Sequence, residues 1–254
     1  MHIFIYDKTF EGFLTVIFDI YERKIVPNKI VGKEHQQTYL FAEKYEIITN
    51  QQKAERVWNG LHKKMSDEAC KMLSVVYLSE LPDVEMLIYS YIQKALVSKV
   101  TIENNFGDKT VMEVMQLFRK VTKETERVRQ FVRFQKTEDN IYFASFDPQY
   151  NVIALTINHF KERFADQPWI IYDTQRKFGF YYDLTNVSEI HFGESHIDPV
   201  TGKLHESVLA SDEKLFQSLW KSYFQHISIK ERTNPKLHKQ LLPKRYWKYL
   251  PEKQ

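Results

Sequence analysis

The N-terminal residues combine a short apolar run with a helical spacing of apolar positions. Residues 2–6 (HIFIY) are almost continuously apolar, which is typical of a buried strand. Asp7 to Thr9 then offer capping side chains, and apolar residues recur at intervals of three and one at Phe10, Phe13, Leu14, Ile17, Phe18 and Tyr21. This spacing predicts a helix over 10–21. Gly12 interrupts it, and either close packing or the approach of a ligand would explain a glycine there.

The next part of the chain is predicted to be one strand followed by helices. Residues 45–49 (YEIIT) form the predicted strand, and Thr49 with Gln52 has the spacing of a capping box. Apolar stripes of helical period then continue through several helices, the longest of which is predicted to run from Thr110 into the 120s. We therefore expect the segment 50–130 to be entirely helical.

From residue 131 onward the apolar period changes to that of strands. The strands are predicted at 131–134, 140–146, 169–173 and 178–182, with an amphipathic helix at 152–164. A polar loop follows at 185–208, and Ser211 with Asp212 caps a last helix. The tail beyond this helix contains three prolines, so we expect it to be irregular or built from short helices that lie along the surface.

Helices and strands are thus segregated along the sequence, which is the pattern of the α+β class. We expect a small antiparallel sheet with flanking helices, and a C-terminal tail that docks on the body. The whole chain, 1–254, is predicted to be a single domain. Its sub-regions are 1–130, mostly helical with an N-terminal strand, 131–210, the sheet with its helix, and 211–254, the last helix and a basic, aromatic tail.

The composition excludes several classes of protein. Cys70 is the only cysteine among 254 residues, which rules out an internal disulfide, a four-cysteine zinc site and a self-contained iron–sulfur cluster. No apolar run is long enough for a membrane span, and the N-terminus lacks the features of a signal peptide, which favours the cytoplasm. Phosphate-binding loops, dinucleotide fingerprints and the common hydrolase and kinase motifs are missing from the sequence. We therefore expect no cofactor, and the sequence leaves open whether the protein is an enzyme.

Charge is unevenly distributed along the chain. The net charge is +3, whereas residues 221–254 contain nine basic and two acidic residues. A basic tail on a mildly acidic body indicates a polyanion or an acidic partner, although lysines alone would also fit a solvated tail. Tyr246, Trp247 and Tyr249 interleave with the basic residues. These rings indicate either that the tail docks on the body or that they stack on bases or on another protein.

Two further segments place basic residues beside aromatic ones. Residues 127–134 (RVRQFVRF) alternate three arginines with apolar residues, which suits phosphate contacts and base stacking. The alternative is internal ion pairing of these arginines with Glu124 and Glu126. In the predicted helix, His159 and Arg163 lie four residues apart and could grip a phosphate or transfer a proton. The alternative for this pair is a solvated surface.

Three other features have weaker functional interpretations. Asp173 and Arg176 lie at a predicted turn, either as a pair that closes the turn or as part of a polar loop that reaches into a site. The loop 191–198, with His205, contains residue types that bind metals, but its spacing matches no strong motif and we predict no metal site. Cys70 lies on the apolar face of a predicted helix, where cysteine usually acts as a small core residue.

Several of these segments, taken in order, resemble a bacterial family described as "probable DNA metabolism protein". The segments that carry the resemblance are YDKTFEGFLT at 6–15, FVRF at 131–134, HF at 159–160, RF at 163–164, WIIYD at 169–173 with Arg176, LWK at 219–221 through Ile229, ER at 231–232, NP at 234–235 and PKRYW at 243–247. In that family the gene usually neighbours one for a radical-SAM protein thought to act in DNA repair or modification. Some relatives carry the same unit fused to a uracil-DNA-glycosylase-like domain. The family has no established reaction, so the resemblance implies no catalytic residues.

The resemblance implies an accessory protein that binds DNA and works with a radical-SAM partner. One cysteine cannot hold a radical-SAM cluster, and the glycosylase segment Gly-Glu-x-Pro-Gly is missing, so base removal or radical chemistry is expected of another protein. A DNA-processing enzyme of unknown reaction and a purely protein-binding scaffold remain alternatives. We expect the helix at 152–164 and the strand that follows it to bring His159, Arg163, Asp173 and Arg176 to one edge of the sheet. The residues expected to contact DNA are Arg129, Arg133, His159, Arg163, Arg176, Lys244, Arg245 and Trp247.

Overall fold

The computed structural model describes residues 1–35, 41–191, 204–227 and 234–253. The chain divides into two compact units, Met1–Thr122 (unit 1) and Lys123–Gln254 (unit 2). The boundary falls inside a long helix, α5 (Lys109–Phe131), a few residues before the first sub-region boundary that the sequence predicted. Whether the two units fold as the single predicted domain stays a prediction.

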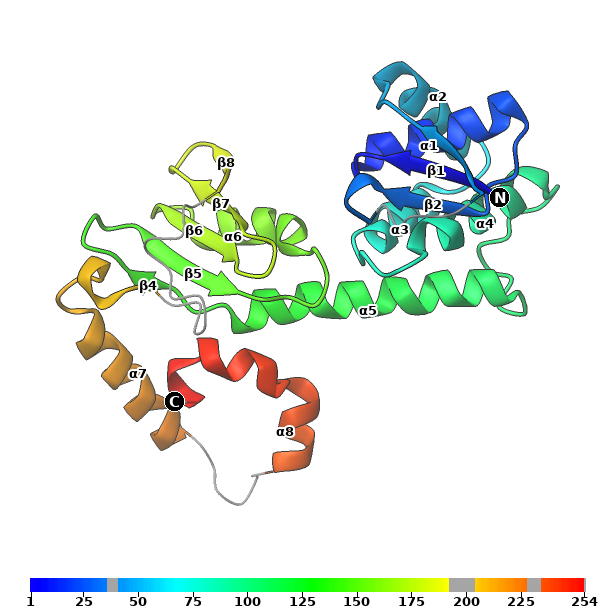
Figure 1. Cartoon of the computed structure of the whole chain (residues 1–254). Coiled ribbons are helices and arrows are strands. Elements are labelled where there is room, and N and C mark those ends of the chain that lie inside the picture. The colour runs from blue at the N-terminus through cyan, green and yellow to red at the C-terminus, as the bar shows by residue number, and fades with distance from the viewer. Residues whose placement is uncertain (36–40, 192–203, 228–233, 254) are drawn as a thin grey trace. The chain divides into compact units, whose positions relative to one another are not determined.

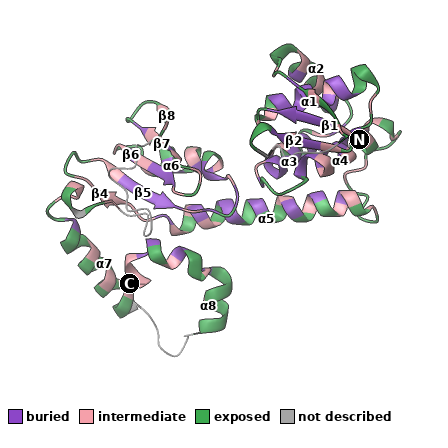
Figure 2. Cartoon of the chain, in the orientation of Figure 1, coloured by how far each residue is buried: buried purple, intermediate pink, exposed green. Residues whose placement is uncertain are grey.

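Unit 1 is built around a three-stranded parallel sheet of order β2-β1-β3. Its strands are β1 (His2–Tyr6), β2 (Lys29–Gly32) and β3 (Glu43–Glu46), and its helices are α1 (Phe10–Arg23), α2 (Gln51–His62), α3 (Asp67–Tyr77), α4 (Val84–Val97) and the first part of α5, with a short 3-10 helix η1 (Lys33–His35). The predicted strand at 2–6 and helix from Phe10 are confirmed, as is the helical character of 50–130. The residues of β1 from Ile3 to Tyr6 are buried because this strand lies in the middle of the sheet (Figure 2).

The start of α1 is capped by Thr9, within the segment that the sequence predicted, whereas the capping of α2 differs from the prediction. The prediction of a capping box at Thr49 and Gln52 is wrong, because Asn50 caps α2 by accepting a hydrogen bond from the Lys53 amide at 3.0 Å. The Thr49 hydroxyl instead donates to the Asp7 carboxylate at 2.6 Å. Gly12 is explained by the same contacts, since a Cβ there would overlap the Asp7 carboxylate and lie 2.8 Å from the Thr49 hydroxyl. The space beside Gly12 is therefore filled by side chains of unit 1 itself.

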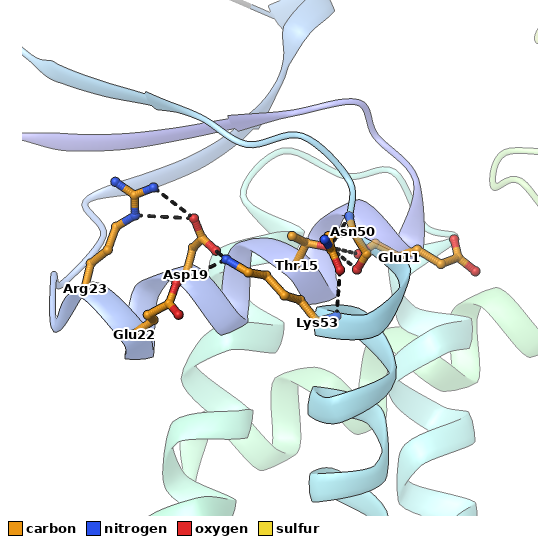
Figure 3. Close-up of polar contacts among 7 residues, drawn as sticks. All are labelled: Glu11, Thr15, Asp19, Glu22, Arg23, Asn50 and Lys53. Atoms are coloured by element: carbon orange, nitrogen blue, oxygen red, sulfur yellow. Dashed lines mark hydrogen bonds and ion pairs between the residues drawn. The ribbon is translucent and has the colours of Figure 1, made fainter.

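Helix α1 is joined to α2 by a polar cluster (Figure 3). The Lys53 ammonium of α2 donates to the buried Asp19 carboxylate at 2.7 Å and to Glu22 at 3.1 Å. Arg23 pairs with the same Asp19 at 3.1 Å. The Thr15 hydroxyl reaches the backbone carbonyl of Asn50 at 3.2 Å. Every group of this cluster has a partner within unit 1, so we assign it to helix packing.

Unit 2 contains a five-stranded mixed sheet of order β4-β5-β6-β7-β8 (Figure 1). Its elements after α5 are β4 (Gln135–Lys136), β5 (Tyr142–Phe146), η2 (Ile153–Thr156), α6 (Ile157–Arg163), β6 (Trp169–Asp173), β7 (Phe178–Tyr182), β8 (Val187–Ile190), η3 (Glu206–Val208), α7 (Glu213–Ile227), α8 (Pro235–Leu241), η5 (Lys244–Tyr249) and η6 (Pro251–Lys253). The α+β class is confirmed. The sheet is not wholly antiparallel, however, because β5 and β6 are parallel partners, with α6 in the connection between them.

The strand predicted at 131–134 is wrong, because α5 continues through Phe131. Val121, Val128 and Val132 are all buried, and their spacing of seven and four residues is that of one helix face. Figure 2 shows the corresponding alternation of buried and exposed residues along α5. The apolar residues of the segment therefore follow the helical period, and the alternation with arginines is incidental to it.

The C-terminal tail is docked on unit 2, as the sequence predicted. Tyr246, Tyr249 and Leu250 are buried, and the Tyr246 ring stacks on Phe146 of β5 with centroids 4.4 Å apart. The tail consists of short helices, which also agrees with the prediction. Trp247, which is among the residues expected to contact DNA, is half-buried.

Candidate nucleic-acid interface

Arg129, which was expected to contact DNA, is held by an internal ion pair, as is its neighbour Arg127. Arg129 donates to Glu126 at 2.8 Å and to the Leu155 carbonyl at 3.1 Å. The neighbouring Arg127 pairs with Glu124 at 3.1 Å. The alternative of internal ion pairing is thus the arrangement found for this part of the segment.

Arg245 is the centre of the contact that anchors the tail. Its guanidinium donates to both carboxylate oxygens of Glu124, at 2.9 and 2.8 Å. The same buried carboxylate accepts hydrogen bonds from the Tyr246 hydroxyl and from the Gln149 amide, the latter at 2.7 Å. We call Glu124, Arg127, Arg245 and Tyr246 the tail anchor. Because the Arg245 guanidinium already neutralises the buried Glu124 carboxylate, it is not available to bind a phosphate.

Arg176 closes the turn between β6 and β7. Its guanidinium donates to Asp173 at 3.0 Å and to the Pro148 carbonyl at 3.1 Å. The amides of Gln175 and Arg176 also donate to the buried Asp173, each at 2.9 Å. Burial raises the pKa of Asp173, and the Arg176 contacts oppose that shift only in part. The turn-closing interpretation is therefore confirmed.

His159 and Arg163 are exposed on α6. Among the described residues, His159 contacts the Phe160 ring and Arg163 lies over the Phe164 ring, with Arg163 making no ion pair there. The Arg176 guanidinium is occupied by Asp173 and the 148–149 carbonyls instead. The described contacts of His159 and Arg163 are with the neighbouring Phe160 and Phe164 rings, and the site expected at the sheet edge stays a prediction.

Three cations without a carboxylate partner among the described residues lie in the C-terminal helices. Lys236 and Lys239 are exposed three residues apart on α8, and Lys244 is exposed in η5. None of these three ammonium groups pairs with a carboxylate of the described residues, although Lys244 lies 6.0 Å from the centroid of the Trp247 ring. Lys248, in contrast, pairs with Asp147 at 3.0 Å.

A groove of about 460 Å³ runs along α7 in unit 2. Its lining includes four aromatic rings, those of Phe134, Tyr142, Phe216 and Trp220, and the cations Arg133 and Lys136. Of the eight residues expected to bind DNA, only Arg133 is among the described residues that line it. The volume falls within the range of small-ligand sites.

The tryptophan of the groove is held in place by the tail. Trp220 donates its indole N–H to Glu252 at 2.9 Å, and Arg133 donates to the other oxygen of the same carboxylate at 2.8 Å. The Arg133 guanidinium also lies 5.5 Å from the centroid of the Trp220 ring. The Glu252 side chain is only 3% exposed, and although burial tends to raise its pKa, a backbone hydrogen bond and the contacts with Trp220 and Arg133 lower it below the usual value. The carboxylate therefore stays ionised and fixes both groove residues.

Phe216, Trp220 and Lys136 were missed as functional candidates. The sequence placed Trp220 only in the last helix, after the cap at Ser211 and Asp212, and in the LWK segment of the resemblance. The available signal was the number of large apolar residues in α7, which is more than one buried helix face can hold. Four of them are more than half exposed: Leu215, Phe216, Leu219 and Tyr223.

The other candidates have structural explanations or lie outside the described residues. Cys70 is buried, and burial raises the pKa of its thiol to about 11, so it is a core residue. The Tyr6 hydroxyl and the Lys8 ammonium donate to the buried Glu85 carboxylate, and the Tyr77 hydroxyl is hydrogen-bonded to that of Tyr6 at 2.9 Å. In the described ranges no three His, Cys, Asp or Glu side chains form a group fit to hold a metal, and 192–203 lies outside those ranges. None of the helices described combines the length and hydropathy that crossing a membrane requires.

The chain is thus an α+β protein of two compact units, and unit 2 carries a groove lined by aromatic and charged residues. Residues 82–252 match the family described as "Domain of unknown function (DUF4130)", and the chain belongs to that family. A comparison with curated proteins found no match. One similar solved structure is a pGpG-specific phosphodiesterase, PggH from Vibrio cholerae, which is 10% identical over 90% of this chain and 100% of that chain, with a TM-score of 0.28. A likeness of that size supports no argument about this chain.

Proposed function

We propose that this protein is a DNA-binding accessory factor in DNA repair or modification, and that unit 2 carries its DNA-binding surface. The observation that carries the proposal is the set of exposed lysines in the C-terminal helices, Lys236, Lys239 and Lys244, which no described carboxylate neutralises. Residues 123–254 contain 20 Lys and Arg against 17 Asp and Glu, so the net charge of +3 belongs to unit 2. Exposed, unpaired ammonium groups bind phosphates by releasing counterions.

The partner in this proposal is a radical-SAM protein that performs the chemistry. This part rests on the resemblance to the DNA metabolism family, together with the buried, unreactive state of the single cysteine. The role proposed for this chain is to hold DNA for its partner. A protein-binding scaffold is the second candidate, and it is favoured by the exposed apolar side chains of α7, Leu215, Leu219 and Tyr223.

The test is a DNA-binding titration of the full chain at increasing salt concentration. Replacing Lys236, Lys239 and Lys244 together by alanine should weaken binding and flatten the log–log salt slope by about 2 to 3, since each phosphate contact contributes about 0.9. The matched control replaces Lys63, Lys64 and Lys71, three exposed lysines of unit 1, and should leave the slope unchanged. No binding of the wild type to single-stranded or duplex DNA at low salt would overturn the proposal and favour the scaffold.

A further inference from the structure

We propose that the groove along α7 binds an unpaired nucleotide of DNA, with its base stacked on Phe216 and Trp220. The inference rests on the proposed function and adds that the protein recognises unpaired rather than duplex DNA. Both rings line the groove, and Phe216 is 56% and Trp220 38% exposed. Two large rings left in contact with water within one concave surface offer a ready stacking platform, because every base has an apolar face.

The platform is preorganised. Glu252 accepts from the Trp220 indole at 2.9 Å and from Arg133 at 2.8 Å, and the Arg133 guanidinium lies against the indole ring. The Trp220 ring is therefore fixed on its polar edge before a ligand arrives, which lowers the entropic cost of stacking.

Among the described residues, the groove is lined by two cations, Arg133 and Lys136, and by two acidic residues, Asp212 and Glu213, and one of the cations is free to meet a phosphate. Lys136 lines the groove and forms no ion pair with the described residues, so its ammonium is available to a phosphate. The Glu213 carboxylate is already used, since it accepts from the Lys136 amide at 2.9 Å and from Gln217 at 3.0 Å. Asp212 is exposed and supplies an acceptor for a donor on the pairing edge of an unpaired base, such as the N3–H of thymine or an amino group of another base.

An unpaired nucleotide fits these features better than duplex DNA. In a duplex the base faces are stacked on their neighbours and the pairing edges are occupied, so neither the rings nor Asp212 can reach them. A single strand, or a base extruded from a duplex, exposes both. The lysines of α8 and η5 bind phosphates of either form, whereas the groove distinguishes between them.

The experiment measures the affinity of the full chain for two fluorescent probes, a short single-stranded oligothymidine and a blunt hairpin duplex. The wild type is expected to bind the single strand more tightly. Phe216→Leu and Trp220→Leu should each weaken single-strand binding by about tenfold, which corresponds to the loss of one stacking contact, and leave duplex binding unchanged. Trp220→Phe keeps a ring and should retain most of the affinity. Leu215→Ala, on the same helix but outside the lining, is the control.

The outcomes separate this inference from the proposed function. Equal binding of both probes, with no selective effect of the two ring variants, would overturn the groove assignment and leave DNA binding by the lysines intact. Binding of neither probe would overturn the proposed function itself. Phe216 and Leu215 are exposed, so their variants are expected to fold normally, which unchanged thermal unfolding verifies. The Trp220 variants lose the hydrogen bond to Glu252, so Phe216→Leu alone decides the outcome if their thermal unfolding is shifted.

Discussion

The tail anchor should make Glu124 a far more important residue for stability than its neighbour Glu126. Glu124 is 1% exposed and accepts hydrogen bonds from Tyr246, Arg245, Arg127 and the Gln149 amide. Glu124→Ala would leave buried donors without an acceptor and two guanidinium groups without a counterion. Removing one partner of a buried charge network costs about 3–5 kcal/mol.

Glu126 provides the matched control on the same helix. It is 48% exposed, and its ion pair with Arg129 at 2.8 Å is of the surface kind, worth about 0–1 kcal/mol. In urea unfolding followed by tryptophan fluorescence, Glu124→Ala should lower the midpoint strongly and Glu126→Ala hardly at all. Brief trypsin treatment of the Glu124 variant should cut the tail near Lys244 and Lys248 under native conditions. Equal midpoints for the two variants, with an uncut tail, would refute the reasoning.

The same network predicts the pH dependence. Burial alone would raise the pKa of Glu124, but hydrogen bonds from Tyr246 and the Gln149 amide and the charge of Arg245 lower it below the usual value. A carboxyl group whose folded pKa is depressed stabilises the fold above its unfolded pKa, about 4.3 for glutamate. That stability is present at neutral pH and is lost as the pH falls through the lower, folded pKa. The loss of unfolding free energy on acidification, measured by urea unfolding at several pH values, should be smaller in Glu124→Gln, because glutamine does not titrate.

Two substitutions and one chemical modification test the fold of unit 1. Gly12→Ala should destabilise the protein by about 1–3 kcal/mol, since its Cβ would overlap the Asp7 carboxylate, as measured by urea unfolding. Gly60→Ala, in the interior of α2 with nothing within 4 Å of the new Cβ, should instead stabilise it by about 0.5–1 kcal/mol. Cys70 should not react with iodoacetamide in the native protein and should react once the chain is unfolded, as followed by mass spectrometry.

Local patterns in the sequence predicted most elements but not how the strands pair. The spacing of apolar residues located α1 and the helices of 50–130, because each of these elements buries one face at helical period. The short strand β2 (Lys29–Gly32) was missed, since four residues carry too little pattern. The parallel pairing of β5 with β6 depends on contacts between residues far apart in the sequence, which periodicity does not contain.

The candidate site was predicted less well than the fold. Arginine was chosen for its affinity for phosphate, but the same bidentate geometry makes it the best partner for a buried carboxylate. Arg245 and Arg176 take that second role, with Glu124 and Asp173 as their partners. The sequence shows which residues can bind an anion, but only the packing shows which of them have an internal anion already.

The most direct test of the account is to locate bound DNA on the protein. A single-stranded oligonucleotide containing 5-iodouridine is crosslinked by light to the full chain, and the tryptic peptides are analysed by mass spectrometry. Cleavage after Lys214 and Lys221 releases one peptide that contains both Phe216 and Trp220. The account predicts that this peptide carries the main crosslink and that Phe216→Leu reduces it. Crosslinks confined to unit 1, or none at all under low-salt conditions, would contradict it.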